Sequence, residues 1–127
     1  MRPNKALSIR QPWAHLIVAG IKQIENRTWT TRYRGPLLIH AGQLWHDETI
    51  ADIERRHRIA IPRDLQLGGI VGIVDLVDVV TQSDDPYFYG PFGFVLENAR
   101  LLSFTPMRGR LGIWKTTSTN SNRSDGK

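Results

Sequence analysis

The run GGIVGIVDLVDVV, at residues 68–80, places the tightest constraint on what this chain can fold into. It is long, almost wholly apolar and rich in β-branched side chains, which pack well on a pleated sheet. A run of this kind predicts a central strand. Gly72 interrupts it, which indicates a sharp bend or a bulge of the sort that lets a strand turn a barrel corner.

The rest of the chain contains shorter strand candidates and two clear helix candidates. Residues 11–20 predict a helix with Pro12 near its start and Gly20 at its end. Residues 46–57 predict another, with Asp47 as its cap. Further extended segments are expected at residues 5–9, 23–29, 35–41, 94–104 and 111–115. Several short strands with two or three helices predict an α+β protein built on a small, partly open β-barrel.

Length and composition indicate one domain. At 127 residues the chain can bury a single core, which we place within residues 1–115. Residues 116–127 are polar and without periodicity, so we expect a disordered tail there. The absence of Cys excludes disulfides, thiolate metal ligands and a cysteine nucleophile. No segment has the apolar length of a signal peptide or a membrane span, so we expect a cytoplasmic protein without membrane contact.

Positive charge is concentrated in the N-terminal third. Residues 1–46 hold seven Lys and Arg residues against Glu25 alone, and the net charge of the whole chain is +5. The later part is therefore close to neutral. A face that gathered the early cations would attract polyanions, which makes nucleic acid the expected partner. A net charge of this size also suits solubility alone.

Four motifs stand in order along the chain: ALSIRQPWAHLIVAGIKQIENRTW, RGPLLIHAG, GGIVGIVDLVD and GIWK. The first contains the pattern G-x-K-x-x-x-x-R as Gly20, Lys22 and Arg27, with Glu25 between the two cations. In this order the motifs resemble an ASCH domain, the module of the activating signal cointegrator family that belongs to the PUA-like superfamily. The resemblance covers residues 5–115. It implies a PUA-like β-barrel with a cleft beside the first helix, and RNA or DNA as the ligand.

The resemblance also implies a second class of function. One bacterial branch of the family hydrolyses the amide of acetylated cytidine, and ribonuclease activity has been proposed for another. The acetylcytidine branch has a lysine at the position of Lys22 but a threonine where this chain has Glu25. This chain therefore departs from the pattern of that branch.

Lys22, Glu25 and Arg27 are the central site candidates. On an extended strand Glu25, Arg27 and Trp29 project from one face, and Lys22 joins them only if the chain turns after Gly20. Arg27 can hold a phosphate with its planar fork, and Lys22 can do so with a compact charge. Glu25 can accept a hydrogen bond from an exocyclic amine. The alternatives are a structural salt bridge, or catalysis with Lys22 as nucleophile or base and Glu25 as proton carrier.

Two further groups of residues flank this motif. Ser8, Arg10 and Gln11 lie where the first strand meets the first helix, and they suit either an anion site or a turn with a cap. The loop candidate that contains Trp29, Arg32, Tyr33 and Arg34 combines rings that stack on bases with cations that follow phosphates, although a basic loop can also be merely solvated.

The four histidines form no metal-binding motif, and we expect neither a metal nor a cofactor. His40 lies inside an apolar strand, so we expect a core residue or a cleft wall. Its alternative role is that of the base in a ribonuclease.

The sequence therefore predicts a monomeric nucleic-acid-binding module, with RNA ahead of DNA, that recognises a single strand or an unstacked base. A hydrolase acting on RNA or on a modified nucleoside, with Lys22 and Glu25 as acid and base, is the alternative. A protein-interaction module whose basic face docks an acidic partner is the third hypothesis.

Overall fold

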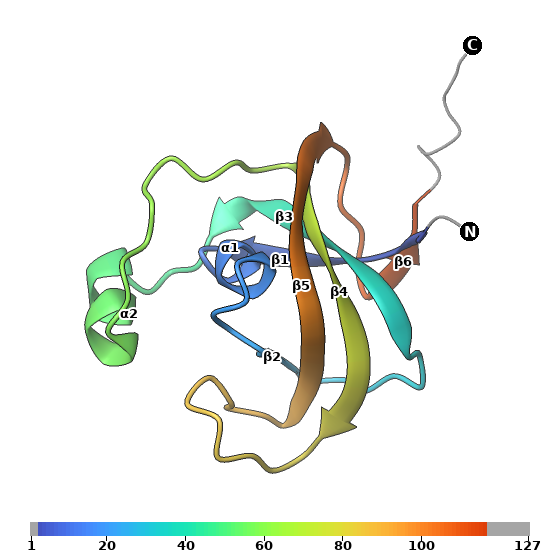
Figure 1. Ribbon diagram of the computed structural model, residues 1–127, viewed down its shortest axis with the longest axis horizontal. Coiled ribbons are helices and arrows are strands. Elements are labelled where there is room, and N and C mark those ends of the chain that lie inside the picture. Colours follow the sequence, from blue (N-terminus) through green and yellow to red (C-terminus); the bar gives the residue numbers. More distant parts are fainter. Residues whose placement is uncertain (1–2, 117–127) are drawn as a thin grey trace.

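The computed structural model of the protein describes residues 3–116, which form a curved β-sheet with two helices (Figure 1). The elements follow in the order β1 (Lys5–Gln11), α1 (Trp13–Val18), β2 (Ile24–Arg27), β3 (Gly35–Trp45), α2 (Ile50–His57), β4 (Gly69–Val80), β5 (Phe92–Pro106) and β6 (Ile113–Lys115). The fold is mixed α+β, as the sequence predicted. Within this part of the chain, neither helix has the length and apolar character needed to cross a membrane.

The six strands form one sheet in the order β2-β5-β4-β3-β1-β6. β1 runs parallel to β3, and the other neighbouring pairs are antiparallel. Within residues 3–116, β2 and β6 are the two edges and do not pair with each other, so the sheet curves without closing. The predicted barrel is therefore not confirmed. A glycine within a strand permits bending, but closure also requires the two edge strands to meet.

β4 lies inside the sheet, between β3 and β5, which confirms the central strand predicted for residues 68–80. Its pairing with β5 shifts register between Ile70 and Gly72. A Cβ atom at Gly72 would lie 2.4 Å from Val18 Cγ1 and 2.5 Å from the carbonyl oxygen of Arg100. Glycine at this position therefore allows both the irregular strand and the close approach of α1.

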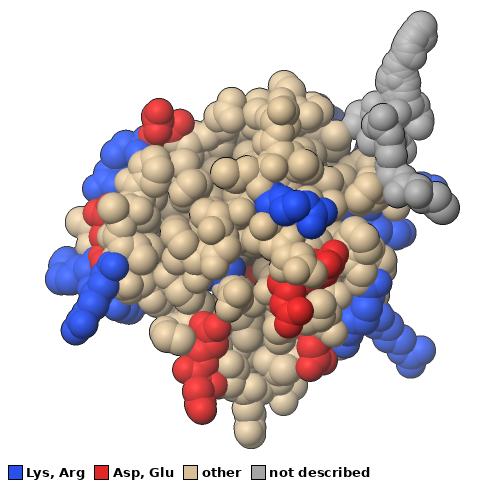
Figure 2. Space-filling model, in the orientation of Figure 1, with Lys and Arg blue, Asp and Glu red and all other residues tan. Residues whose placement is uncertain are grey.

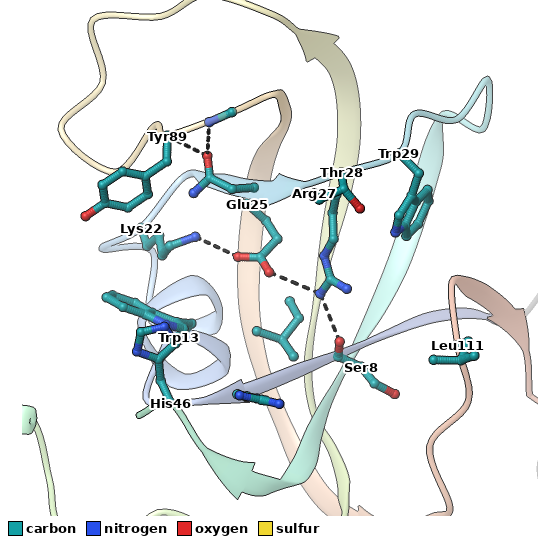
Figure 3. A pocket seen from close by; sticks show the side chains of 14 residues that line it. Ser8, Trp13, Lys22, Glu25, Arg27, Thr28, Trp29, His46, Tyr89 and Leu111 are labelled. Carbon is teal, nitrogen blue, oxygen red and sulfur yellow. Dashed lines mark hydrogen bonds and ion pairs between the residues drawn. The ribbon is translucent and has the colours of Figure 1, made fainter. Parts of the chain in front are cut away.

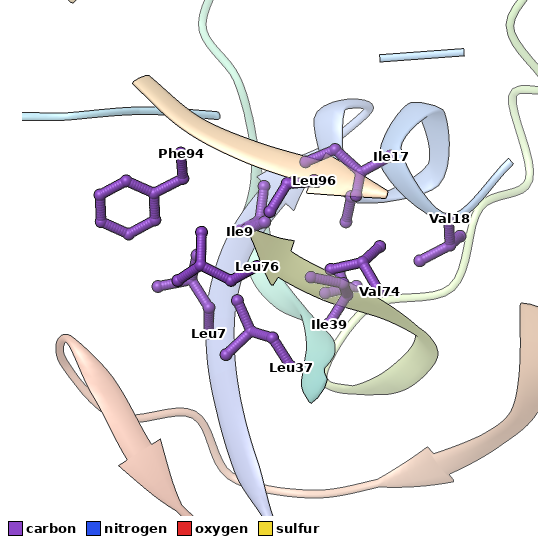
Figure 4. Close-up of a cluster of buried hydrophobic side chains, with 12 residues drawn as sticks. Leu7, Ile9, Ile17, Val18, Leu37, Ile39, Val74, Leu76, Phe94 and Leu96 are labelled. Atoms are coloured by element: carbon purple, nitrogen blue, oxygen red, sulfur yellow. The ribbon is translucent and has the colours of Figure 1, made fainter. Parts of the chain in front are cut away.

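The main hydrophobic core lies between α1 and the sheet (Figure 4). Its larger members are Leu7, Ile9, Ile17, Val18, Leu37, Ile39, Val74, Leu76, Phe94 and Leu96. α1 begins after Pro12, and the chain leaves it through Gly20 in the left-handed conformation, with a φ of 80°, as the sequence predicted. Because α1 is packed on this core, the segment that follows the helix is also held in place.

α2 lies apart from the main core and begins later than predicted (Figure 1). Thr49 caps the helix, since its Oγ1 accepts a hydrogen bond from the N–H of Asp52 at 3.2 Å. The prediction of Asp47 as the cap is wrong, because its carboxylate lies instead 3.3 Å from Arg10 Nη1. His46, which the sequence placed in this helix, belongs to the connection before it.

The last described residue is part of the packed fold. Thr116, expected to begin the tail, is buried, and its N–H donates to the carbonyl of Asn4 at 2.7 Å. The rest of the expected tail, residues 117–127, lies outside the described residues.

Carboxylates from later in the chain lie beside some of the early cations. Arg10 lies 3.3 Å from Asp47, and Arg34 lies 3.9 Å from Asp78. On the face shown in Figure 2, Lys and Arg side chains lie in separate groups with acidic side chains among them. The charge imbalance along the sequence therefore does not become one continuous basic patch on this face.

Candidate functional site

A pocket of about 590 Å³ opens beside α1. Glu25 and Arg27 of β2 lie in its middle, with Trp13 and His46 on one side and Leu111 on the other (Figure 3). This volume falls within the range of roughly 300–1,000 Å³ that is usual for ligand pockets.

The turn after α1 brings Lys22 into this pocket. The N–H groups of Ile21 and Lys22 both donate to the carbonyl of Leu16, at 2.9 and 3.0 Å, so the chain wraps around the end of the helix. The Lys22 side chain is only 3% exposed, and its Nζ donates to Glu25 Oε1 at 2.7 Å and to the carbonyl of Ile24. The turn that the sequence required for Lys22 to join Glu25 is therefore present.

Alternation along β2 places Glu25 and Arg27 on the same face. Arg27 Nη2 donates to Glu25 Oε2 at 3.1 Å and to the backbone carbonyl of Ser8 at 2.9 Å. Each oxygen of Glu25 thus accepts from a different cation, and the cluster of two cations and one carboxylate is net positive. Among the described residues, the buried Nε of Arg27 has no hydrogen-bond partner. An unpaired buried donor is unfavourable, so Arg27 can gain from a ligand that supplies an acceptor.

Aromatic rings flank the charged cluster. The ring centroid of Trp13 lies 5.7 Å from Lys22 Nζ and 5.4 Å from the ring of His46. Trp29 packs edge to face on Phe94 at 5.2 Å. Trp13 and Trp29 both pack against the main core, which fixes their positions. The sequence predicted Trp13 as a core anchor, and the structure shows that it also lines the pocket.

Asn26 ties β2 to the loop that precedes β5. Its Nδ2 donates to the carbonyl of Tyr87 at 2.8 Å, and its Oδ1 accepts from the N–H groups of Tyr89 at 2.7 Å and Gly90 at 2.9 Å. Tyr89 is 63% exposed and lines the pocket. Asn26 therefore fixes the loop that carries this ring.

Six of the predicted site residues line the pocket: Ser8, Arg10, Lys22, Glu25, Arg27 and Trp29. Gln11 does not. It is buried, its Oε1 accepts from the N–H of His15 at 2.9 Å, and its Nε2 donates to the carbonyl of Gln66 at 3.0 Å. This is the capping role that the sequence left open for Gln11.

Arg32, Tyr33 and Arg34 also lie outside the pocket lining. Arg34 Nη1 donates to the carbonyls of Thr31 and Tyr33, both at 2.9 Å, and the Tyr33 hydroxyl donates to the carbonyl of Pro36. These contacts shape the connection between β2 and β3.

Ser8 has contacts on two sides of β1. Its backbone carbonyl accepts from Arg27, whereas its Oγ lies 3.0 Å from His40 Nδ1 and accepts from Trp114 Nε1 at 3.2 Å. His40 is 2% exposed, and its Nε2 lies 2.6 Å from the carbonyl of Met107. A carbonyl can only accept, so Nε2 carries a proton, and in the neutral ring Nδ1 accepts from the Ser8 hydroxyl. His40 is thus a core residue, one of the two positions expected from the sequence.

Comparison with known proteins decides the family, since the ASCH domain model matches residues 7–101. This chain belongs to the ASCH domain family. Activating signal cointegrator 1 from Homo sapiens and its counterpart from Mus musculus are each 31% identical over 128 aligned residues, which cover 88% of this chain. The match spans 22% of the length of those relatives.

The fold of this ASCH domain also occurs in solved structures. ZmASCH from Zymomonas mobilis and two of its point mutants superpose with TM-scores of 0.53 to 0.55. The alignments cover 90 to 92% of this chain and 88 to 92% of theirs, at 14% identity. At this identity the likeness establishes the fold alone.

The lining residues of this ASCH domain that the sequence analysis did not assign to the site include Asn26, His46, Tyr89 and Leu111. Asn26 lies between Glu25 and Arg27 in the charged motif, and this position was the only feature of the sequence that could have pointed to it. The other three lie in connections far from the motif, and no local pattern distinguishes them from solvated loop residues.

An aromatic stack continues beyond Trp13. The rings of His57 and Tyr87 stack at 3.9 Å, and Tyr87 meets Trp13 edge to face at 6.4 Å. Burial lowers the pKa of His57 below its usual value of 6.5, and the nearby positive charge of Arg56 lowers it further. Burial raises the pKa of Tyr87 above its usual value of 10, and the negative charge of Asp85 raises it further. Both rings are therefore neutral near pH 7.

Among residues 3–116, no group of three or more His, Asp or Glu side chains is arranged to hold a metal ion.

Proposed function

We propose that this ASCH domain binds nucleic acid, with RNA ahead of DNA, by receiving an unstacked base and its phosphate in the pocket. The observation that carries the proposal is the Lys22, Glu25 and Arg27 cluster, held between aromatic rings in a space of about 590 Å³. Membership of the ASCH family agrees with this class of ligand.

The free hydrogen-bonding capacity of the cluster favours a ligand rich in acceptors. Lys22 Nζ uses two of its three protons within the protein. The buried Nε of Arg27 has no partner among the described residues. Phosphate oxygens and base carbonyls supply acceptors for both. Glu25 holds the two cations in place, and its remaining lone pairs can accept from an exocyclic amine.

The surroundings of the cluster suit the rest of a nucleotide. Trp13 and Trp29 offer rings for stacking, which typically contributes about 1–3 kcal/mol per base. Arg10 lines the pocket with about half of its side chain exposed, where it can reach a phosphate. Arg32 and Arg34 would follow the backbone outside the pocket.

The test is the salt dependence of binding to labelled RNA and DNA of about 12 nucleotides, measured by fluorescence anisotropy. Log affinity should fall linearly with log salt, and Arg10→Gln should reduce that slope by about 0.7 on a single strand. Arg55→Gln is the matched control, because Arg55 is also exposed but pairs with Asp52 on α2, away from the pocket lining. An affinity that hardly responds to salt would refute phosphate neutralisation as its basis.

A hydrolase is the second candidate function, favoured by one observation. Lys22 Nζ and Glu25 Oε1 lie 2.7 Å apart inside the pocket, within reach for proton transfer. Incubation of the protein with RNA and with acetylcytidine, beside a Lys22→Ala variant, tests this role. Equal amounts of product from both proteins would rule out Lys22 as a catalytic group.

A further inference from the structure

The loop at residues 107–112, between β5 and β6, brings an apolar side chain to the pocket. Leu111 lines the pocket and is 97% exposed, more than the other exposed large hydrophobic residues of the described chain. It lies on the far side of Glu25 and Arg27 from Trp13 (Figure 3). A single exposed leucine is ordinary on a protein surface, but this one stands at the entrance of the proposed binding site.

The base of this loop is fixed although its tip is exposed. The N–H of Met107 donates to the carbonyl of Gly68 at 3.0 Å, and its carbonyl accepts from His40 Nε2 at 2.6 Å. Gly109 lies so close to β1 and β3 that a Cβ atom there would come within 2.7 Å of both Ser8 Oγ and His40 Cε1. A loop held in this way loses little conformational freedom when its tip binds a ligand.

Two cations precede the leucine in this loop. Arg108 and Arg110 are exposed, and neither has an ion-pair or hydrogen-bond partner among residues 3–116. On α2, by contrast, Arg55 pairs with Asp52. A loop that carries an apolar tip beside free cations has the composition of the wedges that enter base stacks while nearby cations hold the phosphates.

We propose that Leu111 is a wedge that enters the base stack of double-stranded nucleic acid and fills the space of a base extruded into the pocket. Arg108 and Arg110 then contact the phosphates beside the opened step. The inference rests on the proposed function, which assigns the pocket to a base, and it names a duplex as the ligand class. A wedge is useful only on a duplex, because a single strand has no stacked gap to fill.

The experiment places 2-aminopurine, whose emission rises when it leaves the stack, at the centre of a short duplex. The wild-type protein should raise this emission. Leu111→Ala should weaken the extruded state by about tenfold, the equivalent of about 1.4 kcal/mol, and reduce single-strand affinity by much less than this. Leu111→Met should retain the effect. Leu101→Ala is the matched control, because Leu101 is 66% exposed and does not line this pocket.

The possible results separate the wedge from the proposed function. Binding to the duplex without a rise in emission overturns the wedge and leaves the pocket proposal standing. An equal loss of single-strand and duplex affinity in Leu111→Ala also overturns it, since Leu111 would then be an ordinary contact. If the wild-type protein binds no oligonucleotide, both proposals fall.

Discussion

Replacement of Glu25 by Gln tests whether one carboxylate holds the pocket cluster together. Glu25 is 8% exposed and Lys22 is 3% exposed, so both charges are largely removed from water. In Glu25→Gln, Lys22 and Arg27 become neighbouring cations without a counter-charge. Removal of one partner from a buried ion pair typically costs about 3–5 kcal/mol. We expect about 3 kcal/mol here, because the Arg27 side chain is 21% exposed and both cations keep a backbone carbonyl.

Thermal and urea unfolding measure this effect directly. A loss of about 3 kcal/mol in a domain of this size should lower Tm by about 10 °C. Lys22→Met should cost less, because Glu25 then still pairs with Arg27. The double variant Lys22→Met with Glu25→Gln should be more stable than Glu25→Gln alone, since it removes one of the two unpaired cations. If Glu25→Gln stays within about 0.5 kcal/mol of wild type, the cluster behaves as a hydrated surface site and the reasoning is refuted.

Burial lowers the pKa of His15 and His57 below 6.5, so the unfolded chain binds protons more tightly at these two groups. The free energy of unfolding should therefore be highest above about pH 6.5 and should fall as the pH drops toward the folded-state pKa values. If the free energy of unfolding depends on pH in His57→Asn as it does in wild type, His57 does not contribute to this dependence. Gly72→Ala should destabilise by at least about 2 kcal/mol in urea unfolding, because its Cβ would meet Val18 at 2.4 Å; a wild-type midpoint would show that α1 can shift without strain. Asn26→Ala removes three hydrogen bonds to the loop before β5 and should cost about 2 kcal/mol. Limited proteolysis should then cleave that loop faster than in wild type, and equal rates would count against the anchoring role.

The sequence by itself determined the features that depend on near neighbours in the chain. The apolar run of β4 predicted an interior strand, and the Pro12 and Gly20 signals predicted the limits of α1. The same local rules brought Lys22 to Glu25, because strand alternation and a helix-ending glycine act within a few residues. The ordered motifs also identified the family.

Only the tertiary structure decided how the sheet ends and what surrounds the charged motif. The sheet closes into a barrel only if β2 and β6 meet, and the sequence of neither strand alone determines whether they do. Gln11 and His40 resemble pocket residues in the sequence, yet their partners lie on other elements and bury them. His46 and Leu111 come from connections whose positions are set by packing between distant segments. Local patterns report backbone periodicity, whereas the walls of a pocket depend on long-range contacts that periodicity does not encode.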